Sequence, residues 1–355
     1  MSKLQGVGDD QAVAQLCSGL SVADSGGAFL GGWVATHIAI AAGGTWLARR
    51  YALQHQLLDQ PGVRRSHQTP TPRGGGIGIV ASLLFALEFL AWRHPAHASL
   101  LGATALGSAM VAGVGWLDDH RPLSPWSRLV VQCIAALLLA WGLRQEGAAS
   151  MTLVVAFVGA MALVNIWNFM DGIDGLAASQ ALIAAAAYGL MTGNELIGWL
   201  AFALSAACLG FLPFNLPRAR IFLGDVGSGT IGYAVAALAA WMMMLDRLHA
   251  PVLMLPVSAF CIDATLTLAA RIARGDRWWL PHTEHAYQYW ARRSGHGPVT
   301  LAFACWTLLA SAVMLAAKAA PPAFIIGLLF VFGLTGVGAW MSLRRIPQSQ
   351  EDTNG

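Results

Sequence analysis

Two amides and two carboxylates follow one another in the segment N-I-W-N-F-M-D-G-I-D-G-L-A, which begins at Asn165 directly after an apolar run. Asn165, Asn168 and Asp171 are spaced three apart, so they line one stripe of a helix until Gly172 breaks it. Together with Asp174 they offer the oxygen ligands that a hard cation such as Mg²⁺ prefers. The alternative is structural, because acids also favour the first turn of a helix.

A pair of adjacent acids, Asp118 and Asp119, ends an earlier apolar run in G-W-L-D-D-H-R-P. Adjacent carboxylates repel each other, and such a pair persists best where a cation or a basic ligand neutralises it. Taken alone, the pair is equally compatible with two acids that only solvate the end of a helix.

Asp225 lies in the glycine-rich turn I-F-L-G-D-V-G-S-G-T, just before another apolar run. Gly224 and the neighbouring glycines predict free backbone N–H groups at a helix N-terminus, which would cradle a phosphate. An acid in such a cradle indicates a metal that bridges it to the phosphate. Phe222 could stack on a base, or its ring could simply pack inside the protein. The glycine-rich turn could likewise be only structural.

Histidines and arginines supply the candidate donors to phosphate. His282 and His285 form H-T-E-H in a loop rich in Arg and Trp, where no Cys or further His completes a zinc set. The basic segment 64–73, which ends at Arg73, predicts an anion-binding rim, with anchoring of anionic lipid headgroups as the alternative. Asp263 lies inside an apolar segment, where an acid indicates either a functional site or a hydrogen bond between helices.

Membrane-spanning helices are the elements that must position these residues. Of the 355 residues 56% are hydrophobic and only 11% are charged, against about 25% charged residues in a typical soluble domain. Continuous apolar runs of about 18 residues can span a bilayer, and their lack of alternation favours helices over a barrel. We therefore predict an all-α, polytopic transmembrane bundle, with a polar N-terminal segment 1–26, a membrane domain 27–343 and a C-terminal tail 344–355.

Eleven spans are predicted, with ten as the alternative. Their ranges are 27–48, 76–92, 99–116, 128–143, 150–167, 176–192, 195–212, 229–245, 251–270, 299–317 and 321–343. With the N-terminus outside and the C-terminus in the cytoplasm, most of the 21 lysines and arginines lie in cytoplasmic segments, as the positive-inside rule requires. The candidate acids, amides and histidines then gather at the cytoplasmic face, a position that suggests phosphate chemistry between a soluble and a lipid substrate.

Four motifs in order carry a resemblance to a known family. D-D-H, N-x-x-N-F-M-D-G-I-D-G-L, F-L-G-D-V-G-S and H-x-x-H lie between about residues 40 and 300. They resemble the polyprenyl-phosphate N-acetylhexosamine-1-phosphate transferases of glycosyltransferase family 4. That family includes phospho-N-acetylmuramoyl-pentapeptide transferase and the N-acetylglucosamine-1-phosphate transferases that begin bacterial surface polysaccharides.

The resemblance implies the reaction and its partners. A HexNAc-1-phosphate passes from a UDP-N-acetylhexosamine to undecaprenyl phosphate in the bacterial inner membrane and UMP is released, which initiates O-antigen-like or cell-wall polysaccharide. Membrane lipids are further partners, no nucleic acid is expected, and the oligomeric state stays open, with a homodimer among the options. A lipid-phosphate phosphatase or a transporter of an anionic substrate is the alternative.

The resemblance also implies roles for matching residues. Asn168 and Asp225 bind Mg²⁺, with Mn²⁺ as an alternative, and Phe222 stacks on uracil. Asp118 and Asp119 receive the polyprenyl phosphate, which Asp118 deprotonates or orients.

Asp171 and Asp174 lie near the metal and the nucleotide-sugar, whereas His282 and His285 donate to its phosphates or sugar. The family commonly has H-x-H-H, and Glu284 stands here in place of the middle histidine. This departure resembles a branch that starts O-antigen-type repeats with N-acetylfucosamine or a related 6-deoxy sugar. Asp263 followed by Thr265 matches a family pattern to which we assign no role. One-step transfer and a covalent two-step route both stay open.

Overall fold

The computed structural model describes the backbone of residues 7–59, 70–216, 218–277, 279–280 and 282–345, and the side chains from residue 29 onward within these ranges. Arg64 and Arg65 of the predicted basic rim lie outside the described residues. The helices are α1 (Val7–Gln54), α2 (Ile77–Arg93), α3 (Ala98–His120), α4 (Pro125–Gln145), α5 (Ser150–Phe169), α6 (Leu176–Met191), α7 (Glu195–Asn215), α8 (Asp225–Leu245), α9 (Ser258–Ala273), α10 (Ala286–Ser294), α11 (His296–Ala316) and α12 (Pro322–Arg344). Three 3₁₀ segments, Pro95–His97, Ala250–Met254 and Ala317–Ala319, and one antiparallel pair, β1 (Leu58–Asp59) and β2 (Thr71–Pro72), complete the described elements.

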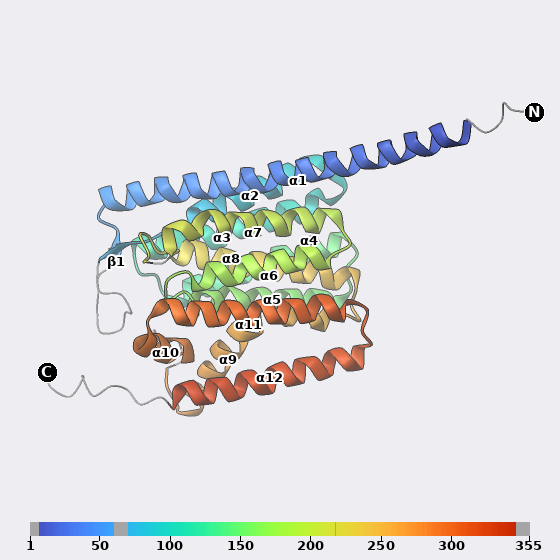
Figure 1. Ribbon diagram of the computed structural model, residues 1–355. Helices are drawn as coiled ribbons and strands as arrows, with labels where there is room; N and C mark the ends of the chain where they lie inside the picture. The colour runs from blue at the N-terminus through green and yellow to red at the C-terminus, as the bar shows by residue number, and fades with distance from the viewer. Residues whose placement is uncertain (1–6, 60–69, 217, 278, 281, 346–355) are drawn as a thin grey trace, which may run out of the picture.

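The long helices run side by side as a bundle, which confirms the all-α membrane architecture (Figure 1). Within the described ranges, seven helices are both long and apolar enough to cross a membrane, namely α3 with its preceding 3₁₀ turn, α4, α5, α7, α8, α11 with its following 3₁₀ turn, and α12. All helices except the short α10 overlap predicted spans. The total of eleven crossings stays a prediction.

Local sequence explains where several helices begin. The Ser124 side chain accepts a hydrogen bond from the Trp126 backbone N–H, and Pro125 takes the first helical position of α4, where its missing N–H costs nothing. The Asn194 side chain caps α7 in the same way, through the N–H of Ile197. Polar capping residues thus define where these helices begin, whereas the apolar runs alone define the helix starts only to within several residues.

Two predicted boundaries differ from the structure. The ninth predicted span, 251–270, is not continuous, because a 3₁₀ segment at Ala250–Met254 precedes α9, which begins only at Ser258. Pro251 and Pro256 lack backbone N–H groups, so a regular helix cannot pass through this segment without losing hydrogen bonds. In addition, α1 begins at Val7, well before the predicted first span 27–48, and the division into a polar segment 1–26 and a membrane domain stays a prediction.

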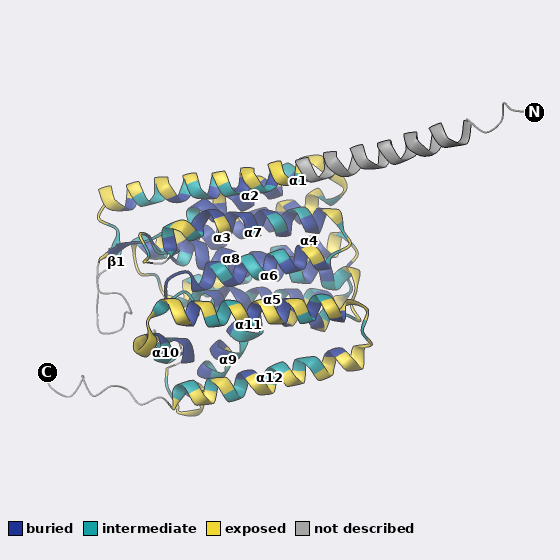
Figure 2. Cartoon of the chain, in the orientation of Figure 1, coloured by how far each residue is buried: buried dark blue, intermediate teal, exposed yellow. Residues whose placement is uncertain are grey.

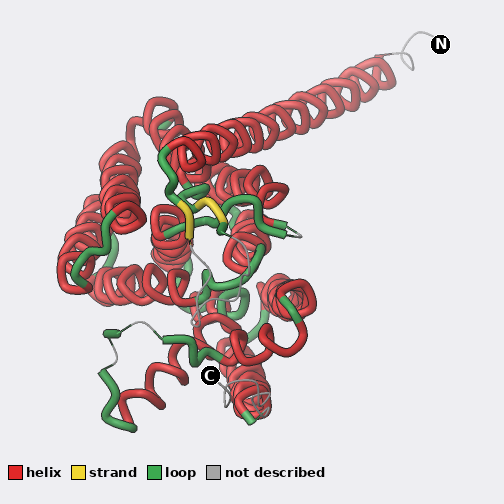
Figure 3. Tube along the Cα trace, turned by 90° about the vertical axis from the view of Figure 1, so that its left-hand side faces the viewer, coloured by secondary structure: helices red, strands yellow, loops and turns green. Residues whose placement is uncertain are grey.

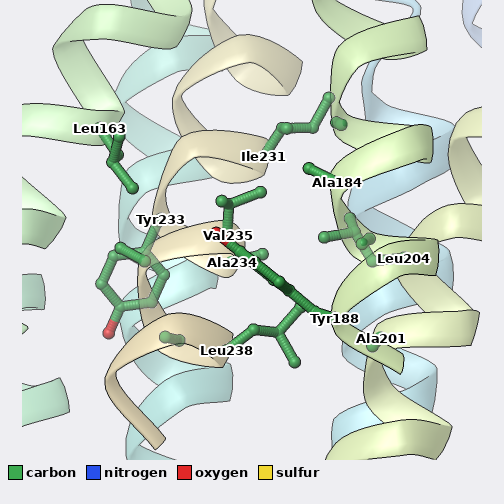
Figure 4. Packing of buried hydrophobic residues seen from close by; sticks show 14 of the residues in the cluster. Leu163, Ala184, Tyr188, Ala201, Leu204, Ile231, Tyr233, Ala234, Val235 and Leu238 are labelled. Carbon is green, nitrogen blue, oxygen red and sulfur yellow. The ribbon is translucent and has the colours of Figure 1, made fainter. Parts of the chain in front are cut away.

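The core lies where α5, α6, α7 and α8 meet, and α8 is the most buried of the candidate spans. Figure 4 shows Tyr188 of α6 among side chains of α7 and α8, and its hydroxyl donates to the Leu253 backbone oxygen at 2.6 Å. A Cβ on Gly232 of α8 would lie 2.3 Å from the Leu163 backbone oxygen, so only glycine permits this approach of α8 to α5. Figure 2 shows the contrast between this buried centre and the exposed surface of α12.

The candidate site residues converge at one end of the bundle. The ends of α3, α5, α7 and α9 and the starts of α4, α6 and α8 lie here together with β1, β2 and α10, on the left in Figure 1. Figure 3 faces this end, which we call the loop end. The chain before α8 pairs with the chain before α2, because the Phe222 N–H donates to the Pro72 oxygen and the Gly75 N–H donates to the Phe222 oxygen. The fold therefore brings the predicted motifs together.

Candidate active site

A cavity of about 620 Å³ lies at the loop end between α3, α4, α5, α8, α9 and the chain before α10. Its polar lining is formed by Arg128, Gln132, Asn165, Asn168, Asp171, Asp225, His282, His285 and Gln288. Its apolar lining includes Val111, Val114, Leu129, Val158, Met161 and Leu268. One cavity thus offers charged groups and hydrocarbon-compatible walls together.

Arg128 joins two of the predicted acids. Its Nη1 atom lies 2.9 Å from Asp118 Oδ2 and 3.2 Å from Asp225 Oδ2. Asp118 is fixed further by the Leu123 backbone N–H, which donates to its Oδ1 at 2.6 Å. Acids brought this close repel one another, and the guanidinium between them offsets that repulsion. Arg128 was not among the predicted site residues.

Asp119 has a structural environment that differs from that of its neighbour. Its carboxylate accepts hydrogen bonds from the backbone N–H groups of Asp225 (3.0 Å) and Val226 (3.3 Å), the first two residues of α8. Arg73 Nη2 lies 3.0 Å from the same carboxylate, which is almost completely buried. Asp119 therefore caps α8 from α3.

This cap corrects one sequence interpretation. The first amides of α8 were predicted to be free for a phosphate, but the Asp119 carboxylate occupies them. Gly224 is required for a different reason, because its φ is +77° and a Cβ there would lie 2.5 Å from Asp119 Oδ2. The glycine makes room for the cap and the turn, so these two amides are not free, and a contact of Gly224 with phosphate stays a prediction.

The two predicted amides both line the cavity. The Asn168 Nδ2 atom donates to Ser228 Oγ at 3.3 Å, which aligns Asn168 with the first turn of α8, where Asp225 lies. Asn165 Nδ2 donates to Gln132 Oε1 and to the Met161 backbone oxygen, both at 2.8 Å. Asn168 is thus positioned beside Asp225, whereas Asn165 ties α5 to α4.

Asp171 and Asp174 face different surroundings. Asp171 lines the cavity, where burial, together with the nearby charges of Asp225 and Asp119, raises the pKa of its carboxyl to about 8. Asp174 Oδ2 accepts from the Ala219 backbone N–H at 3.1 Å, and its Oδ1 lies 3.1 Å from His296 Nδ1. Asp174 is absent from the cavity lining and braces the neighbouring loops.

The H-T-E-H segment is fixed by the cap of α10. Asp263 of α9 accepts hydrogen bonds from the backbone N–H groups of Ala286 (2.9 Å) and Tyr287 (3.0 Å), at the start of α10. The Tyr287 hydroxyl donates to the Phe169 backbone oxygen at 3.0 Å, so α10 is also attached to the end of α5. His285 therefore faces the cavity from a fixed position. Of the two interpretations of Asp263, the hydrogen bond between helices explains why an acid lies in this apolar segment.

The remaining residues of this loop have clear partners. Burial, reinforced by the nearby charge of Arg271, lowers the pKa of His282 to about 4, so its ring is neutral at physiological pH. Glu284, in place of the family's histidine, forms ion pairs with Arg271 and Arg274, and Arg344 of α12 lies 3.6 Å away. Glu284 thus anchors the loop outside the cavity.

Besides Gly224, two predicted substrate contacts do not line this cavity. Arg73 pairs with Asp119, lies 3.9 Å from Asp225 Oδ1 and lines a neighbouring pocket together with Asp59 and His120, and its role in an anion-binding rim stays a prediction. The Phe222 side chain is half-buried, and its backbone pairs with residues 72 and 75. The uracil-stacking role of Phe222 stays a prediction.

A divalent cation fits the oxygen donors at the cavity floor. Among the described residues, no three His, Cys, Asp or Glu side chains form a metal-binding group by themselves. Mg²⁺, however, is often held by one or two protein oxygens together with substrate phosphates. Asn168 and Asp225 offer such a pair on one cavity wall, so the donor set suits a metal that arrives with a diphosphate.

Sequence reasoning missed several residues that position the site. Arg128 lies in the first turn of α4, after the S-P start and well separated in the sequence from the acidic pair, so its sequence position gives little indication of its role. Asn215 Oδ1 accepts from the Gly175 N–H at 2.6 Å, and its Nδ2 donates to the Ile221 oxygen at 2.9 Å, so it links two loops. Gln132 and Tyr287 have no distinctive sequence pattern, whereas Ser228 ends the F-L-G-D-V-G-S motif but was not singled out.

Comparison with known proteins places the chain in a family. Residues 101–243, which include Asp118, Asp171 and Asp225, match the model of glycosyl transferase family 4. The chain is 30% identical over 251 residues to the probable undecaprenyl-phosphate N-acetylglucosaminyl 1-phosphate transferase of Bacillus subtilis, covering 64% of this chain and 68% of that relative. The chain belongs to glycosyl transferase family 4, whose members include polyprenyl-phosphate N-acetylhexosamine-1-phosphate transferases.

Other relatives agree with this assignment. A decaprenyl-phosphate N-acetylglucosaminephosphotransferase of Mycobacterium tuberculosis is 34% identical over 210 residues, 50% of this chain and 51% of the relative. The undecaprenyl-phosphate alpha-N-acetylglucosaminyl 1-phosphate transferase of Escherichia coli is 27% identical over 268 residues, 68% of this chain and 71% of the relative. The similarity thus spans about half the length of the mycobacterial relative.

Proposed function

We propose that this protein transfers a HexNAc-1-phosphate from a UDP-sugar to a polyprenyl phosphate. The observation that carries the proposal is the cavity whose polar floor holds Arg128, Asn168, Asp171 and Asp225 while its walls are apolar. A nucleotide diphosphate and a lipid phosphate can meet there without the lipid chain entering water. The names of the relatives, which refer to decaprenyl and undecaprenyl phosphate, support the same acceptor class.

In the proposed reaction an oxygen of the lipid phosphate attacks the sugar-linked phosphorus in line. The bond from that phosphorus to the oxygen bridging the two phosphates breaks, and UMP leaves with the bond's electrons. The lipid phosphate is already ionised at neutral pH, so the protein has mainly to position it and to stabilise the charge that develops. Arg128 lies between Asp118 and Asp225, where its guanidinium could release these carboxylates and bind phosphate oxygens of the substrate in their place.

Asn168 and Asp225 would hold Mg²⁺, which when bound supplies positive charge to the diphosphate. Asp118 is held by Arg128 and Leu123 in a fixed orientation from which it orients the incoming lipid phosphate. His282, neutral because of its lowered pKa, is suited to hydrogen-bond the sugar or its phosphate without adding charge, and His285 lines the same cavity. Asp119 and Asp174 do not contact the substrate in this proposal. They hold the backbone at the start of α8 and in the turn before it in place, and so maintain the shape of the site.

The test is an assay of purified protein with undecaprenyl phosphate, Mg²⁺ and a panel of UDP-HexNAc donors. We expect UMP release with at least one donor, starting with UDP-N-acetylglucosamine because relatives carry that name, and including UDP-N-acetylfucosamine. Absence of UMP with every donor, from folded protein, would contradict the proposal. Release of inorganic phosphate from the lipid without any donor would identify a phosphatase in its place.

Two variants test the assigned metal ligands. Asp225→Asn and Asn168→Ala should lower turnover at least about 100-fold, because each removes a group that holds the charged centre of the reaction. Asp246→Asn, at the opposite end of α8 and largely exposed, is the matched control and should retain near wild-type turnover. Near-normal turnover in either ligand variant would show that the metal assignment is wrong.

A further inference from the structure

A second cavity of about 240 Å³ lies between α9, α10, α11 and α12, away from the catalytic cavity. We call it the α12 cavity. Its lining is formed by Ala259, Ile262, Asp263, Ala286, Trp290, Ala302, Phe303, Trp306, Gly336, Ala339, Trp340 and Leu343. None of these residues, apart from Asp263, was considered for a site on sequence grounds, and the proposed reaction uses none of them.

The α12 cavity is chemically apolar although four of its lining side chains, Asp263 and three tryptophans, carry polar atoms. The Trp306 indole N–H donates to Ser258 Oγ and the Trp340 indole N–H donates to Thr267 Oγ1, both at 3.0 Å. Asp263 accepts hydrogen bonds from Thr267 and from two α10 amides. Asp263, Trp306 and Trp340 thus have their partners within the protein, so the cavity offers little to water or to a polar ligand.

Volume and position indicate what fills it. An apolar protein cavity of about 150 Å³ stays dry and binds benzene, so 240 Å³ suits a longer hydrocarbon segment. On α12 the lining runs from Gly336 to Leu343, about 10 Å at 1.5 Å per residue. Both α11 and α12 are candidate membrane spans, and α12 is largely exposed to the surroundings, so bilayer hydrocarbon lies beside the cavity.

Charge favours an anionic lipid as the source of this hydrocarbon. Beyond Leu343, at the loop end of α12, follow Arg344 and the exposed Arg345, and α10 adds Arg292 and Arg293. Glu284 offsets only part of this positive charge. A phospholipid with its chain in the cavity would place its phosphate at the level of these arginines.

The substrate's polyprenyl tail is the less suitable occupant. Leu268 and His285 line the catalytic cavity, whereas Asp263 and Ala286 line the α12 cavity, so α9 and the start of α10 separate the two. A tail anchored at the catalytic phosphate would have to cross that wall.

We propose that one acyl chain of an anionic membrane phospholipid occupies the α12 cavity and supports the start of α10. The chain would pack against Asp263 and Ala286, which form the cap that holds His285 at the catalytic cavity. Binding of the lipid does not depend on the proposed function. Only the effect of the lipid on turnover rests on the proposed function.

Native mass spectrometry in detergent, with dipalmitoyl phosphatidylglycerol as the probe, measures the binding. We expect wild-type protein to retain one lipid per chain, and Ala302→Phe, which fills the cavity, to bind it at least tenfold more weakly. Ala312→Phe on the exposed face of α11 is the matched control and should bind like wild type. Equal binding by both variants, or one-for-one displacement of the lipid by undecaprenyl phosphate, would overturn the proposal.

Hydrogen exchange tests the link to α10 independently of activity. Removal of lipid should accelerate exchange at the Ala286 and Tyr287 amides at least several-fold in wild type and in Ala312→Phe. Ala302→Phe should show slow exchange with and without lipid, because the added ring replaces the chain. Exchange that is insensitive to lipid in wild-type protein would contradict the supporting role.

Discussion

Arg128 is the residue on which the electrostatics of the catalytic cavity depend. Its guanidinium contacts Asp118 and Asp225 at 2.9 and 3.2 Å, in a lining that also contains Asp171. Without it, the carboxylates of Asp118 and Asp225 would share one partly buried site, with Arg73 as a remaining nearby cation. Removing one partner of such a network leaves buried charge uncompensated, which costs more than the pair itself contributes.

Arg128→Gln is therefore expected to lower kcat/KM at least about 100-fold, while Arg128→Lys, which keeps the charge but not the planar fork, should lower it less. UMP release is the measurement, with circular dichroism to show that the helices are intact. Arg144→Gln, an exposed arginine at the other end of the same helix, is the control. A kcat/KM within threefold of wild type for Arg128→Gln would remove this arginine from the proposed site.

Asp171 gives the metal-free protein a distinctive pH dependence. Its pKa is raised from 3.8 to about 8, so the folded protein holds this proton more tightly than the unfolded chain. The stabilisation from that proton is fully present below the unfolded pKa and is lost as pH rises through about 8. In EDTA, the wild-type melting temperature should therefore fall between pH 6 and pH 8.5.

Asp171→Asn should show a smaller fall over the same range, because the amide remains neutral. Asp276→Asn, which changes an acid of the loop before α10 that pairs with Arg274, should keep the wild-type dependence. Identical pH profiles for wild type and Asp171→Asn would show that this carboxyl is ionised in the folded protein.

At the scale of elements, carboxylates of one helix repeatedly cap another. Asp119 of α3 caps α8 and Asp263 of α9 caps α10, while Asp174 and Asn215 connect the turns before α6 and α8. Each of these side chains satisfies backbone N–H groups that would otherwise lack partners at a helix start or in a loop. Side chain to backbone hydrogen bonds therefore add to the backbone pairing and the ion pairs that hold the loop end together.

Asp263→Ala tests this type of connection. Loss of an acceptor for two α10 amides should destabilise the protein by about 1–3 kcal/mol and weaken donor binding more than it lowers kcat, because α10 carries His285. Denaturant unfolding and separate KM and kcat values measure the two effects. The control is Thr265→Ala, two residues away on the exposed face of α9, and equal effects of both changes would contradict the capping role.

The elements could be predicted from the sequence much better than the roles of the acids. Apolar run length places the helices, because it depends on the local chain alone. The different roles of Asp118 and Asp119 depend on partners far along the chain, such as the Asp225 amide 106 residues away. The requirement for Gly224 also depends on a distant residue. The sequence indicates a turn there, but it does not show that the Asp119 carboxylate occupies the space that a side chain would need.

For the whole molecule, the orientation in the membrane is the prediction that remains to be measured. The helices place the loop end and the turn around Lys318 at opposite ends of the bundle (Figure 1). In a background without the five native cysteines, Arg293→Cys should react with a membrane-impermeant thiol reagent only after the membrane is opened. Lys318→Cys should react in intact cells, and the reverse pattern would invert the predicted topology.

The cap of α8 by Asp119 has an electrostatic consequence for any cation at the cavity floor. The aligned peptide dipoles of a helix give its N-terminus a charge of roughly +0.5, which would repel a divalent ion bound at Asp225. The Asp119 carboxylate, in contact with the first two amides of α8, offsets that partial charge at its source. The acid that looks purely structural therefore makes the positive end of a buried helix compatible with a bound cation.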